Sequence, residues 1–208
     1  MNVLKRYFIF LFLSQLVFSQ KNEFGKDYYL VGLLSEDIGK WKTNKSSDIV
    51  EQFDINEQLI LDKIICIYKV EKPFVTKTDY EQFILHSKNL QNDVDKFYNW
   101  TFDDGVSNEN NDLFYSGSLK TELIKTNSQK LSFLVGVIDR FGFIENQQIE
   151  LKIICSSLKF NLIKEIILGE NCKIVKEVFY KDNLPSSYNL VFIPSKNIIE
   201  MLKFTDCK

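Results

Sequence analysis

The C-terminal half of this chain carries the pattern that most restricts its fold, an alternation of apolar and polar residues. Between Ile149 and Cys155, apolar side chains alternate with polar ones. This alternation is typical of a strand with one buried face. Three further apolar runs predict strands, at 131–138, 174–180 and 188–193. Asp139 and Gly142 fit the first and fourth positions of a type I turn, which would join the strand at 131–138 to the strand at 149–155 in a hairpin.

The clearest helix signal lies over residues 79–99. Thr78 and Glu81 have the spacing of a capping box. Seven apolar residues then fall on one helical stripe, namely Tyr80, Phe83, Ile84, Leu90, Val94, Phe97 and Tyr98. Pro194 and Ser195 favour the start of a short C-terminal helix. The expected fold class is therefore α+β, a mainly antiparallel sheet with one long amphipathic helix packed on it and a short C-terminal helix.

Other apolar runs are less decisive. Runs at 28–34 and 59–70 are short enough to be strands, and 158–168 fits either a helix or a strand, of which we favour the strand. Residues 56–66 also resemble residues 146–155. We interpret this similarity as two similar core strands rather than as a duplication.

The N-terminus predicts export. Lys5 and Arg6 precede the apolar segment Tyr7 to Phe18, which is shorter than the roughly 20 residues of a membrane-spanning helix. We expect a cleaved signal peptide over residues 1–19 and a single exported domain over 20–208, periplasmic or extracellular, with a lobe boundary near 101–112. Alanine is absent from the sequence, a bias that favours an AT-rich bacterial genome.

The chain has four cysteines, Cys66, Cys155, Cys172 and Cys207. An oxidising compartment permits disulfides among them, and three pairings are open. A Cys172–Cys207 bridge would fix the C-terminal tail, while free thiols are the alternative. The wide spacings exclude a compact Cys-x-x-Cys redox or zinc motif.

No catalytic, cofactor-binding or metal-binding set is predicted, and no cofactor. His86 is the single histidine and falls at the edge of the expected helix stripe, so a structural role is favoured over a catalytic one. The loop 101–112 collects oxygen ligands that could bind calcium, but its spacing is not that of an EF-hand. We interpret the loop as a solvated acidic segment.

These observations favour an exported, non-catalytic binding or interaction protein, of an immunity or inhibitor type, whose partner is another exported protein. The net charge is −2, and Arg140 is the one arginine outside the predicted signal. Both argue against nucleic acid as a partner. The alternative is an exported hydrolase that uses paired carboxylates, although the sequence favours a protein that is not an enzyme.

Overall fold

The computed structural model describes residues 23–34, 40–43, 48–68, 74–78, 82–107, 113–154, 156–182 and 185–205. Within these ranges no helix is long and apolar enough to cross a membrane. The first 22 residues lie outside them, so the signal peptide over 1–19 stays a prediction.

The chain repeats one order of elements: a helix, two strands, a helix, two strands and a helix. The first half runs through α2 (Lys26–Leu33), β1 (Lys40–Thr43), β2 (Ile49–Asp54), the 3-10 turn η1 (Ile55–Glu57), α3 (Gln58–Ile67), β3 (Phe74–Lys77), β4 (Gln82–His86) and α4 (Lys88–Asp95). The second half runs through α5 (Asn127–Phe141), β7 (Gly142–Glu145), β8 (Gln148–Ile154), α6 (Ser157–Gly169), β9 (Lys173–Tyr180), β10 (Ser187–Ile193), α7 (Lys196–Leu202) and η3 (Lys203–Thr205). The hairpin of β5 (Tyr98–Ser107) and β6 (Leu113–Leu119), followed by η2 (Thr121–Leu123), connects the two halves.

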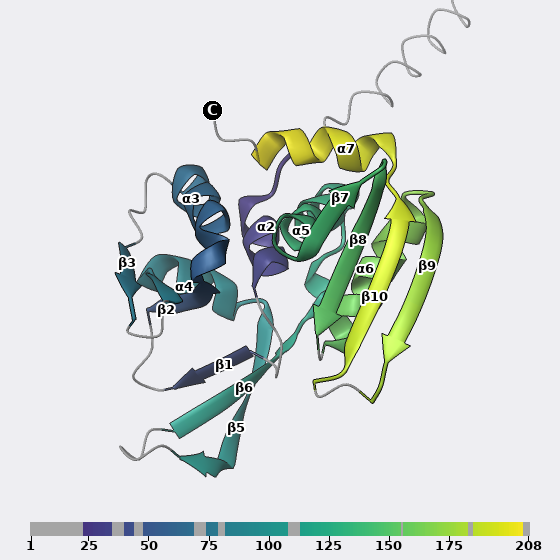
Figure 1. The fold of residues 1–208 in the computed structure, drawn as a ribbon. Coiled ribbons are helices and arrows are strands. Elements are labelled where there is room, and N and C mark those ends of the chain that lie inside the picture. Colours follow the sequence, from purple (N-terminus) through teal and green to yellow (C-terminus); the bar gives the residue numbers. More distant parts are fainter. Residues whose placement is uncertain are drawn as a thin grey trace, which may run out of the picture.

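All strand pairs within the described residues are antiparallel, and the two halves differ in one strand. The second half forms a sheet in the order β7-β8-β10-β9, with α6 against one face (Figure 1). The first half forms β2-β4-β3, while β1 pairs with β6 beside β5. In the repeat, β1 corresponds to β7. It pairs with β6 of the connecting hairpin, however, so the first sheet lacks the edge strand that β7 provides in the second sheet.

Helices α2 and α5 join the halves, and a glycine on each lets their backbones meet. A Cβ atom on Gly32 would lie 2.1 Å from the Phe133 carbonyl oxygen, and one on Gly136 would lie 2.1 Å from the Tyr29 carbonyl oxygen. No side chain fits at such a distance. The reciprocal contact places the two glycines at equivalent positions of the repeat.

Matching caps mark the repeat at its other end. The Ser87 hydroxyl accepts a hydrogen bond from the Leu90 amide, and the Ser195 hydroxyl accepts one from the Ile198 amide. Each serine thus satisfies a free amide in the first turn of the last helix of its half. The sequence Ser-Lys-Asn begins both segments.

The long helix predicted over 79–99 is wrong. Residues 82–86 form the central strand β4, which pairs with both β2 and β3, and α4 begins only at Lys88. The Thr78 hydroxyl does accept a bond from the Gln82 amide, at 3.3 Å, but this bond closes the β3–β4 turn instead of capping a helix. Pairing on two edges outweighs the local helical pattern.

Four predicted strands are helices, because a short apolar run has the same appearance in a buried helix and in a buried strand. Runs 28–34, 59–70, 131–138 and 158–168 lie largely in α2, α3, α5 and α6. Local caps identify two of these helices: the Thr126 and Gln129 side chains form a capping box before α5, and the Ser156 hydroxyl caps α6.

The interpretation of residues 56–66 and 146–155 as two similar core strands is wrong, because the first segment lies in η1 and α3 while the second lies mainly in β8. The expected turn at Asp139 is also wrong, because Asp139 lies inside α5. The hairpin turns instead at Asn146 and Gln147, which both have positive φ, as a tight two-residue turn requires.

The coarser prediction of an α+β fold with antiparallel sheets is confirmed. The described chain has six α-helices, so the single long helix is the part that fails. Strands over 148–154, 173–180 and 187–193 and the C-terminal helix after Ser195 lie where the sequence predicts them. The single domain and the lobe boundary near 101–112 stay predictions.

Replacing Gly32 with alanine tests the helix contact. The added methyl group must push α2 from α5, and we expect Gly32→Ala to lower the free energy of unfolding by about 3 kcal/mol or more. Chemical denaturation measures the loss. Gly169→Ala is the control, because nothing lies within 4 Å of its Cβ position. Equal stability of the two variants would contradict the close contact.

Candidate functional site

The α2–α5 contact brings a hydrogen-bonded group of polar side chains together. The Tyr29 hydroxyl donates to Asp139 at 2.8 Å, and the Lys63 ammonium donates to the other Asp139 oxygen at 2.8 Å. The Asp139 side chain is 9% exposed. Burial and the adjacent carboxylate raise the pKa of Tyr29 well above its ordinary value, so Tyr29 stays a hydrogen-bond donor at neutral pH.

Arg140, the next residue of α5, faces the first half of the chain. Its guanidinium donates two bonds to Glu57, at 2.7 and 3.1 Å, and one to the Leu33 carbonyl at 2.8 Å. It also donates to the Gln52 carbonyl at 3.2 Å and lies 3.6 Å from Glu51. One side chain, 5% exposed, therefore holds α2, β2 and η1 to α5.

Lys159 of α6 contacts the same end of α2. It is 1% exposed, and its ammonium donates to the Leu34 carbonyl at 2.6 Å. The ring centres of Phe133 and Phe141 lie 5.9 and 5.0 Å from the nitrogen. Two cations from the second half thus meet the negative end of the α2 dipole.

This donor set does not suit a divalent metal ion. Asp139 is already paired with Lys63, and Arg140 and Lys159 add positive charge nearby. Across the part of the chain that the structure describes, no three His, Cys, Asp or Glu side chains gather into a metal-binding group. Carboxylates Glu36 and Asp37 follow α2 in the sequence but lie outside the described residues.

A second candidate surface is the outer face of the β7-β8-β10-β9 sheet, the face away from α6. Strand register places Lys152 opposite Asn189, Lys176 opposite Val191 and Lys173 opposite Ile193. Leu190 and Phe192, the alternate residues of β10, are fully buried beneath. Three exposed lysines therefore share one sheet face.

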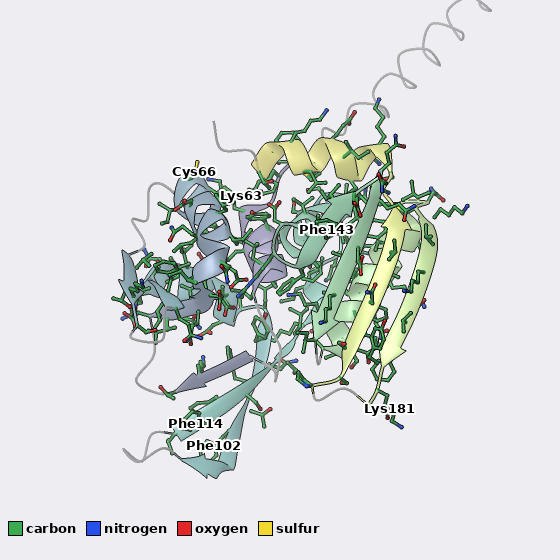
Figure 2. The ribbon with its side chains drawn as sticks, viewed as in Figure 1. Lys63, Cys66, Phe102, Phe114, Phe143 and Lys181 are labelled. Carbon is green, nitrogen blue, oxygen red and sulfur yellow. The ribbon has the colours of Figure 1, made fainter. Side chains whose placement is uncertain are left out.

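The rest of this face is mixed. Its acidic residues are Glu145 and Glu150. The Glu150 carboxylate accepts a hydrogen bond from the side-chain amide of Asn189 at 2.6 Å. Figure 2 shows Phe143 on β7, where it is 62% exposed, and Lys181 beyond the end of β9. The surface carries a small positive excess together with polar and aromatic groups.

His86 lies in β4, not on a helix. Its Nε2 atom lies 2.9 Å from the Thr76 hydroxyl, and its Nδ1 atom lies 3.4 Å from Asp48. These contacts link strand β3 to the start of β2. The calcium interpretation of the acidic loop stays untested, because residues 108–112 and the side chains of residues 103–107 lie outside what is described.

Cys172 is a free, buried thiol, so the suggested Cys172–Cys207 bridge is wrong. The Ser195 amide donates to its sulfur at 3.2 Å, and burial raises the pKa of the thiol. Cys66 does form a disulfide. The two remaining cysteines, Cys155 and Cys207, lie outside the described residues.

Sequence reasoning missed Asp139, Arg140 and Lys159 as a group. One signal could have found the first two: Tyr-Leu-Val-Gly-Leu-Leu at 29–34 matches Phe-Leu-Val-Gly-Val-Ile at 133–138. Aligning these segments identifies the repeat and places both residues at the end of a helix pair. Lys159 has no such local signal.

Comparison with known proteins identifies the fold. No protein-family model and no curated protein matches the chain. Among solved structures, mesophilic variants of the homing endonuclease I-DmoI match with a TM-score of 0.52 and 14% identity, over 88% of this chain and 96% of theirs. I-DmoI in complex with DNA and calcium matches with a TM-score of 0.51 and 14% identity, over 89% and 91%.

This likeness corrects several predictions. The protein was expected to be a non-catalytic exported binding protein without a nucleic-acid partner, yet its fold is similar to that of an endonuclease that binds target DNA. The leaning against an enzyme is wrong for the same reason. Nothing in the comparisons supports a secreted or periplasmic protein.

Arg140→Met tests the Arg140 contacts. Removing the cation leaves buried acceptors and Glu57 without their donor, so we expect the free energy of unfolding to fall by about 3 to 5 kcal/mol. Urea denaturation measures it. Lys164→Met is the matched control, since Lys164 pairs with Glu177 at the surface and should cost less than about 1 kcal/mol. Similar losses in both variants would show that Arg140 is not the link between the halves.

Proposed function

We propose that this chain binds double-stranded DNA through the outer face of the β7-β8-β10-β9 sheet. The observation that carries the proposal is that Lys152 of β8 and Lys173 and Lys176 of β9 lie on the same open sheet face. The likeness to I-DmoI, a homing endonuclease solved with its target DNA, supports it.

Strand geometry suits this role. Side chains on one sheet face stand at regular spacing, and a β-ribbon fits the major groove of B-DNA. Lysines there would neutralise phosphates, while Gln148 offers hydrogen bonds to base edges. The overall charge of −2 does not oppose this, because binding depends on the local charge of the face that meets the duplex.

Removing the three lysines tests the interface. We expect the Lys152→Gln, Lys173→Gln, Lys176→Gln triple variant to raise the Kd for duplex DNA about tenfold or more at 0.1 M salt. The slope of log Kd against log salt should fall by about 2 to 3, one unit for each lost phosphate contact. Fluorescence anisotropy with a labelled duplex measures both quantities.

The matched control removes three other exposed lysines, Lys88, Lys125 and Lys196. They lie on α4, before α5 and on α7, so the net charge changes equally while the sheet face stays intact. We expect this variant to bind within about twofold of the parent. Equal weakening by both variants would show general charge attraction and overturn the proposed face.

DNA cleavage is a second candidate function. Glu36 and Asp37, the two carboxylates that follow α2 in the sequence, favour it, because phosphodiester hydrolysis by metal ions needs carboxylate ligands. Incubation of plasmid DNA with the chain and Mg²⁺ or Mn²⁺ tests the activity. Glu36→Gln with Asp37→Asn should abolish cleavage and leave DNA affinity in Ca²⁺ unchanged. Unaltered cleavage would exclude these two residues.

A further inference from the structure

A half-open cleft of about 590 Å³ lies between the end of α5, strands β7 and β8, and helix α7 with η3. Its volume falls within the range of small-molecule sites, about 300 to 1,000 Å³. The DNA proposal does not use this cleft, because none of the three lysines Lys152, Lys173 and Lys176 lines it.

The walls are mainly apolar and open to solvent. Ile144 is 59% exposed, Ile199 46% and Ile193 40%, and Leu202 lies among them. Isolated exposed apolar residues are common, but several that line one hollow indicate a binding surface. The apolar walls favour a ligand with a hydrocarbon body.

The charged groups at the cleft favour an anion. Lys63 and Asp139 form one ion pair in the wall and leave no net charge. Lys203 also lines the cleft, is exposed, and forms no ion pair with any residue in the described ranges. One uncompensated ammonium beside an apolar hollow complements a ligand with one negative head.

We propose that this cleft binds a small amphiphilic carboxylate, with its hydrocarbon tail against Ile144, Ile193 and Ile199 and its carboxylate at Lys203. Lys203 acts as a point charge, which suits a single anionic head. The ligand would contact α5 and η3 together, next to the Asp139–Lys63 pair that connects the two halves.

Calorimetric titration of the full chain with decanoate, decan-1-ol and acetate tests both parts of the proposal. Decanoate should bind with one site per chain, decan-1-ol should bind about fivefold more weakly, and acetate should not bind. Lys203→Gln should weaken decanoate about fivefold and leave decan-1-ol unchanged. Ile199→Asp should weaken decanoate at least about tenfold, because it places a carboxylate in the apolar wall.

Leu168→Asp is the control for the second variant, since Leu168 is 54% exposed on α6 and does not line the cleft. It should bind decanoate as the parent does. Equal affinities for decanoate and decan-1-ol would overturn the anion specificity, and unchanged binding by Ile199→Asp would overturn the site. No decanoate binding by the full chain would overturn the proposal.

Discussion

A close backbone contact between α2 and α5 determines how the two halves are arranged. Gly32 and Gly136 each face a carbonyl oxygen of the partner helix at a distance that excludes any side chain. Each half supplies one helix, so neither can bury this surface alone. The C-terminal end of α2 then receives hydrogen bonds from Arg140 and Lys159 of the second half. The position of the open sheet face follows from this contact.

Charge distribution explains why net charge is a poor argument against a nucleic-acid partner. A net charge of −2 argues against nucleic acid only if charge is spread evenly. In the fold, two of the cations, Arg140 and Lys159, are buried at a helix end, while Lys152, Lys173 and Lys176 share one exposed face. A total cannot separate these populations, because strand register decides which side chains share a face.

Local patterns predicted the sheet of the second half better than the rest. The alternation at 149–153 records one buried and one solvated face, so it survives in the structure. Runs at 28–34 and 131–138 show no alternation of apolar and polar residues, because both belong to helices that are buried on nearly all sides. Residues 82–86 show the opposite failure, where pairing with two neighbouring strands overrides a helical pattern. The polar group around Asp139 depends on contacts between distant segments, which no local window contains.

Native-state hydrogen exchange tests most directly whether the helix pair makes the two halves one cooperative unit. The amides of Leu30 and Leu33 in α2 and of Leu134 and Val137 in α5 are the ones to follow, because all four residues are buried at the contact. The account predicts the same opening free energy for both helices, equal to that of global unfolding. Exchange of α2 at a much lower free energy than α5 would show that the first half opens alone, and would contradict it.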